Sequence, residues 1–106
     1  MKDVAQTLRQ FTLRAISDDF EDFERIVQDV TEWTCEEGLK AHRDVILRAL
    51  EGLIDDGYAQ AYTLSSRPPG SAEAVSYSAA RLDELWFYVT PKGKHLARTL
   101  QAKWTS

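Results

Sequence analysis

The sequence predicts a mostly helical α+β fold, and three observations lead to this expectation. Apolar residues recur at helical spacing through most of the first half of the chain. A short aromatic run, Leu85 to Thr90, alternates in the way that strands do. Gly57 and Pro91 stand where the pattern changes, and these residue types commonly end and begin helices. Because 106 residues suffice for one core and not for two, we expect a single domain.

Three helices are expected before Gly57, at about residues 3–16, 18–34 and 39–56. Asp3 is a typical N-terminal capping residue, and Asp18 followed by Glu21 matches a capping box for the second helix. In the third helix the apolar residues share one face, which we expect to point into the core. These residues are Leu39, Ile46, Leu50, Leu53 and Ile54.

Two strands are expected after Gly57, at about residues 58–64 and 85–90, followed by a last helix at about 91–104. Alternation in the second strand places Leu85, Phe87 and Val89 on one face and Trp86 and Tyr88 on the other. Residues 65–84 are rich in serine, alanine and proline and are interpreted as an irregular loop. A short helix from Ala72 to Leu82 is the alternative for this segment.

The charge of the chain is unevenly distributed. The net charge is −4, yet residues 17–37 hold nine acidic residues and a single basic one, Arg25. A protein that binds polyanions through general electrostatics would not have this distribution. The acidic stretch is either a solvated helix face or a docking surface for a basic partner.

Several functional classes are not expected from the composition. Cys35 is the only cysteine, so neither an intramolecular disulfide nor a cysteine-based zinc site can form, and a reducing cytoplasm is favoured. His42 and His95 lie far apart and have no partner at metal-ligand spacing. No apolar run approaches the ~20 residues that cross a membrane. We therefore expect no enzyme, no metal, no cofactor and no membrane association.

Two stretches resemble a known family. Ile46-x-x-x-Leu50-x-x-Leu53-x-x-x-Gly57-Tyr58 resembles the third helix and following strand of winged helix-turn-helix proteins. Phe87-Tyr88-Val89-Thr90-Pro91-Lys92-Gly93-Lys94 resembles the second wing strand and Thr-Pro-x-Gly turn of bacterial MarR- and PadR-like regulators. The resemblance implies a three-helix bundle, a two-stranded β-wing with its loop at 65–84, and a C-terminal helix. It also implies double-stranded DNA as partner and transcriptional regulation in a bacterium as function.

In such regulators the third helix enters the major groove and the wing contacts phosphates. The resemblance therefore assigns DNA contacts to Lys40, Arg43 and Arg48 in the third helix and to Arg67 in the wing. Projection of that helix places a charged stripe outward, and its members are expected to form ion pairs at i, i+3 or i, i+4 spacing. The stripe comprises Lys40, Asp44, Arg48, Glu51 and Asp55.

The alternative is a winged-helix domain that binds protein and not DNA. Its surface would be the acidic second helix, through Asp22, Asp29 and Glu32, or a patch formed by Val45 and Leu47, which occupy positions that are usually polar in DNA readers. Trp104 lies close to the end of the sequence, where a tryptophan is expected to be covered by something. Because related regulators often dimerise through terminal helices, a homodimer through the first and last helices is also expected.

Overall fold

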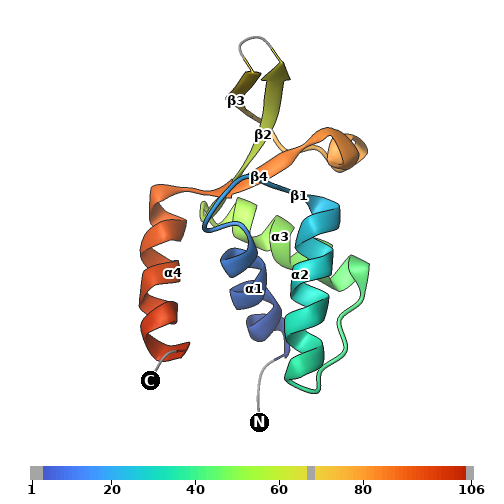
Figure 1. Cartoon of the computed structure of the whole chain (residues 1–106), viewed down its shortest axis with the longest axis vertical. Helices are drawn as coiled ribbons and strands as arrows, with labels where there is room; N and C mark the ends of the chain where they lie inside the picture. Colours follow the sequence, from blue (N-terminus) through green and yellow to red (C-terminus); the bar gives the residue numbers. More distant parts are fainter. Residues whose placement is uncertain (1–3, 67–68, 105–106) are drawn as a thin grey trace.

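The computed structural model describes residues 4–66 and 69–104. Its helices are α1 (Val4–Ala15), α2 (Phe23–Glu36), α3 (Arg43–Asp55), the short 3-10 helix η1 (Ala79–Glu84) and α4 (Pro91–Trp104); its strands are β1 (Glu21–Asp22), β2 (Ala59–Ser66), β3 (Pro69–Val75) and β4 (Trp86–Val89). Helices α1, α2 and α3 lie on one side of β4, and the hairpin of β2 and β3 projects away from them (Figure 1). The expected α+β class is confirmed.

The four strands form one antiparallel sheet in the order β1-β4-β2-β3. Strand β2 pairs with β4 along its first half, where Ala59 faces Val89 and Tyr62 faces Trp86. It pairs with β3 on its other edge from Ala61 to the hairpin tip. Residues 76–85 therefore carry the chain from one edge of β2 to the other, and we call this segment the crossover.

The core lies between the three helices and the inner face of the sheet. Ile46 and Leu50 are fully buried and Leu53 is 1% exposed, so the predicted apolar face of α3 is confirmed. Burial of such side chains contributes roughly 1.5–3 kcal/mol each. From the sheet the core receives the side chains that alternation placed together: Leu85, Phe87 and Val89.

Contacts of Gly57, Thr90 and Gly93 hold the start of α4 against the start of β2. Gly57 has φ +81°, a conformation that favours glycine, and it reverses the chain after α3. The Thr90 hydroxyl donates to the Gly57 carbonyl over 2.6 Å and accepts from the Gly93 amide over 3.0 Å. A Cβ at Gly93 would lie 2.0 Å from the Tyr58 carbonyl oxygen. These contacts confirm the helix-ending role predicted for Gly57, and they make Thr90 the N-terminal cap of α4.

The predicted start of the second helix at residue 18 is wrong. Helix α2 begins at Phe23, and Asp22 is its N-cap, with a side-chain oxygen that accepts from the Arg25 amide over 2.8 Å. Glu21 and Asp22 instead form β1, opposite Phe87 and Trp86 of β4. Pairing with a distant strand thus outweighs the local capping pattern.

The predicted start of the third helix at residue 39 is also wrong, since α3 begins at Arg43. The amide of Leu39 donates to the Thr34 carbonyl over 2.8 Å, which closes the end of α2. Lys40 lies in the connection, ahead of the helix, and His42 is the N-cap without a side-chain hydrogen bond.

The segment interpreted as a loop contains two regular elements. Pro69–Val75 forms strand β3, and Ala79–Glu84 forms a 3-10 helix in place of the alternative helix from Ala72 to Leu82. Most side chains of β3 are small, and the strand has no alternating apolar pattern of its own. Only the tertiary pairing with β2 makes this segment a strand.

Candidate functional site

The exposed side of α3 is where the resemblance places DNA contacts, and one of its predicted residues is engaged within the chain. The Arg43 guanidinium forms an ion pair with Glu24 of α2 and lies 4.8 Å from the centroid of the Phe23 ring. Arg43 therefore ties the N-terminus of α3 to the N-terminus of α2. An incoming phosphate would have to compete with the Glu24 carboxylate for it.

Lys40 and Arg48 are exposed, and within the described residues neither forms an ion pair. The ion pairs predicted along the outward stripe do not form there either. For Lys40 and Asp44 the reason is geometric, because Lys40 precedes the helix and the two residues are not one turn apart. The part of α3 that stays exposed, apart from the paired Arg43, holds Arg48 between Asp44 and Asp55.

The crossover covers one flank of α3. The Tyr77 hydroxyl donates to the Glu51 carboxylate over 2.8 Å, and the Tyr77 ring lies 6.2 Å from that of Phe87. Burial, together with this hydrogen bond and the Glu51 charge, raises the pKa of Tyr77 to about 12. Sequence reasoning missed Tyr77, because nothing local indicates that residues 76–85 cross over a helix.

The predicted apolar patch on α3 is partly used by the fold. Val45 and Leu47 are half-buried and pack against the core, as do Tyr77 and Leu82 from the crossover. The hairpin beyond α3 supplies little positive charge: β2 and β3 hold one charged residue, Glu73, and it is acidic. Arg67, the predicted wing contact, lies outside the described residues.

The exposed side of α2 carries a shallow groove between two rows of side chains. One row contains Val27, Thr31 and Cys35, and the other contains Gln28, Glu32 and Glu36. Each row advances four residues at a time, the spacing of ridges that pack into a partner helix. The groove is thus apolar on one side and acidic on the other.

The three acidic residues predicted for this surface have different roles. Asp22 caps α2, and Asp29 forms an ion pair with Arg25 at 3.4 Å. Glu32 is exposed and makes no ion pair within the described residues. Burial, and then the charge of Asp29, raises the pKa of nearby Glu21. Only Glu32 of the three is therefore available to a partner without disturbing the fold.

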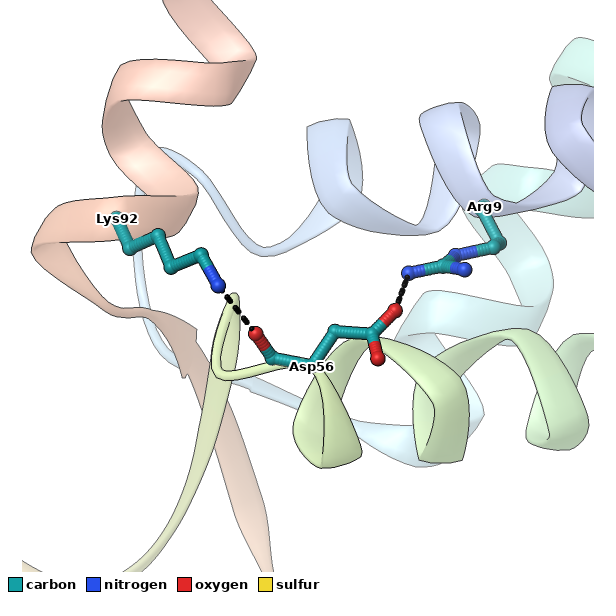
Figure 2. A network of polar contacts seen from close by, with 3 residues as sticks. All are labelled: Arg9, Asp56 and Lys92. Carbon is teal, nitrogen blue, oxygen red and sulfur yellow. Dashed lines mark hydrogen bonds and ion pairs between the residues drawn. The ribbon is translucent and has the colours of Figure 1, made fainter.

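A cleft of about 460 Å³ lies between α1, the end of α3 and α4. At its edge Arg9 binds the Asp56 carboxylate at 2.5 Å, and Lys92 donates to the Asp56 carbonyl over 2.8 Å (Figure 2). Leu96 and Leu100 of α4 line the cleft. The side chain of Trp104, predicted to lie at an interface, is outside the described part of the chain.

No family model matches the chain, and neither a curated protein nor a solved structure shows significant similarity to it. In the described ranges 4–66 and 69–104, no three His, Cys, Asp or Glu side chains are arranged to hold a metal ion. No helix in those ranges has the length and apolar character needed to span a membrane.

Proposed function

We propose that the chain is a winged-helix-type domain that binds another protein, with the exposed side of α2 as docking surface for a basic segment of the partner. The order of the elements supports the winged-helix part of the proposal. A helix, a short strand, two helices, a projecting hairpin and a last helix follow one another, and β1 pairs with the strand that returns from the hairpin. The Thr90-Pro91 turn after that strand also agrees with the resemblance.

The observation that carries the protein-binding part is the groove along α2. A helix that presents apolar residues flanked by lysine or arginine would place its apolar ridge along Val27 and Thr31 and its charges against Glu32 and Glu36. The charge of residues 17–37, nine acidic residues against Arg25, favours such a partner over any polyanion.

A DNA-binding transcriptional regulator is the second candidate, and one observation favours it. Lys40, Arg43 and Arg48 gather around the N-terminal half of α3, which is the half that reads bases in winged-helix regulators. Two features weigh against it. Glu24 already neutralises Arg43, and the crossover lies on the flank of α3 that carries Glu51.

A paired titration separates the two candidates. The first probe is an amphipathic peptide with leucines and lysines at helical spacing, and the second is a mixed-sequence DNA duplex, each at low and moderate salt. Protein docking predicts that Glu32→Gln with Glu36→Gln weakens peptide binding about tenfold, since two charge contacts are lost, while Arg48→Gln leaves it unchanged. DNA reading predicts the reverse: duplex affinity that falls steeply with salt and is lost with Lys40→Gln and Arg48→Gln.

Two further parts of the proposal concern assembly and location. The cleft between α1 and α4, with Leu96 and Leu100 on its wall, supports a homodimer through the terminal helices. Light scattering at micromolar concentration would give twice the 12.1 kDa chain mass if this is correct. The free thiol of Cys35 is consistent with the cytoplasm. A monomer whose state does not change with Leu96→Ser and Leu100→Ser would contradict the dimer.

A further inference from the structure

The outer face of the sheet carries apolar and aromatic side chains where an antiparallel sheet normally carries polar ones. In the described residues, α1, α2 and α3 all lie on the inner side of β4 (Figure 1). The outer face is half-exposed at its three aromatic positions, and Leu64 beside them is 37% exposed. The three are Tyr62 of β2 and Trp86 and Tyr88 of β4.

Register and ring contacts bring these side chains together. Asp22, Trp86, Tyr62 and Ala74 face one another in a row across the four strands. Phe20, just before β1, lies 4.9 Å from both the Tyr62 and the Tyr88 ring, measured between centroids. We call Phe20, Tyr62, Trp86 and Tyr88 the aromatic face.

The surroundings of the aromatic face are acidic. The four strands contain no lysine or arginine. Of their three acidic residues, Asp22 lies on this face opposite Trp86, whereas Glu21 and Glu73 pair with Phe87 and Thr63 and so lie on the inner side. Asp18 and Asp19, both exposed, precede Phe20 directly. Lys92, which follows β4, is held by the Asp56 carbonyl and lies over Tyr58. Anionic side chains beside half-exposed rings attract cations twice, through charge and through the ring quadrupole.

The chain already uses this chemistry elsewhere. Arg14 lies 4.4 Å from the Trp33 ring centroid, and Lys92 lies 4.6 Å from that of Tyr58. In the described part of the chain no such cation lies over a ring of the aromatic face. Within the described residues, the rings of the aromatic face are therefore not taken up by a cation of the chain itself.

We propose that the aromatic face binds an arginine-rich extended segment of a partner protein, whose guanidinium groups stack on Tyr62 and Tyr88 and pair with Asp18 and Asp19. The surface is distinct from the groove on α2, but the inference rests on the proposed function in that both take a basic partner. Arginine is favoured over lysine because its planar group both stacks and pairs.

Charge decides against two other occupants. The phosphates of a single-stranded nucleic acid would meet Asp18, Asp19 and Asp22 with no cation on the strands to hold them. A second copy of the sheet would bring the same acidic residues against each other, which costs free energy. Only a cationic segment gains from both the rings and the carboxylates.

The test is a titration of the full chain with a labelled nonapeptide of alternating arginine and valine, followed by fluorescence anisotropy. The same peptide with citrulline for arginine is the neutral control. The affected variants are Tyr62→Leu, which keeps apolar area and removes the ring, and Asp18→Asn with Asp19→Asn. Tyr62→Phe keeps the ring and is the matched control. Thermal unfolding of each variant confirms that it folds.

We expect the arginine peptide to bind at least about tenfold more tightly than the citrulline peptide. Tyr62→Leu should weaken binding about threefold to tenfold, in the range of a partly desolvated cation–π contact. Tyr62→Phe should have no effect. Equal binding of the two peptides, no binding, or an unchanged affinity of Tyr62→Leu overturns the inference. If only Glu32→Gln with Glu36→Gln weakens binding, the α2 surface is supported and the aromatic face is not; if only the sheet variants weaken it, the reverse holds.

Discussion

The two faces of the sheet are built from the same strands and are both apolar, but they differ in what covers them. On the inner face Leu85 and Phe87 are fully buried under three helices. On the outer face Trp86 and Tyr88, their neighbours along β4, remain half-exposed. The apolar character of the inner face is explained by folding, whereas that of the outer face is not.

This difference separates side chains that maintain the fold from those available for binding. Where an apolar side chain is buried, its chemistry follows from the need for a core. Where it is left half-exposed in a row with others, contact with another molecule is the role that we propose for it. Substitutions on each face, and in the segments next to them, can test how sharply the two faces differ.

The strongest test is the pair Phe87→Ala and Trp86→Ala, adjacent residues on opposite faces. Phe87→Ala should lower the free energy of unfolding by about 3–5 kcal/mol, because it removes a buried ring and leaves a cavity. Trp86→Ala should cost roughly half as much or less, since its surroundings are open to water. Chemical denaturation measures both. Equal losses would show that the outer face is as important to stability as the inner one.

Thr90→Val tests the junction where the inner face ends and α4 begins. The substitution keeps the shape of the side chain and removes its hydrogen bonds to Gly57 and Gly93. We expect a loss of about 1–2 kcal/mol in the free energy of unfolding, the range of an N-cap replacement. Thr90→Ser keeps the hydroxyl and serves as control; a loss as large as that of valine would contradict the capping role.

Tyr77→Phe tests the crossover at the point where it packs on α3. The pKa of Tyr77 is about 12 in the folded chain and 10 in the unfolded chain. Its contribution to stability is therefore complete below pH 10 and is lost as the pH rises toward 12, because the unfolded chain releases the proton first.

We expect the free energy of unfolding of the parent chain to decrease between pH 10 and 12. The Tyr77→Phe variant should lack much of this pH dependence. Below pH 10 the same substitution should cost about 1 kcal/mol through loss of the hydrogen bond to Glu51. Denaturation midpoints across this pH range provide the measurement. An identical pH profile in both chains would show that the hydroxyl does not titrate as proposed.

Leu64→Thr should have the smallest effect. Leu64 lies on the outer face of β2, toward the hairpin tip. Threonine also has a high propensity for strands. We expect a change within about 0.5 kcal/mol, as for surface positions in general. A larger loss, measured by thermal unfolding, would mean that the outer face contributes to the core after all.

The sequence was informative where a local pattern and the tertiary packing agree. The buried face of α3, the alternation in β4 and the Thr90-Pro91 turn each follow from residues close together in the chain. Helix α4 begins where Pro91 indicated. In these segments local periodicity and burial favour the same structure.

Tertiary contacts decided the rest. Asp22 pairs with Trp86 in the sheet, and α2 therefore begins later than its local pattern predicts. Strand β3 forms because it pairs with the free edge of β2. The candidate site was the part least predictable from the sequence. Its contacts between Arg43 and Glu24 and between Tyr77 and Glu51 join elements that are far apart in the chain. The aromatic face was only partly visible, because Phe20 was assigned to a helix.

The crossover makes the hairpin and the body independent in register. Since the chain re-enters the sheet on the opposite edge of β2, adding or removing residue pairs at the hairpin tip does not slide β4 past β1. The ten residues 76–85 connect the base of the hairpin to β4, so this connection keeps its length when the hairpin tip changes. Protein engineers can therefore lengthen, shorten or graft this hairpin as a cassette, and natural variation in its length need not alter the scaffold beneath.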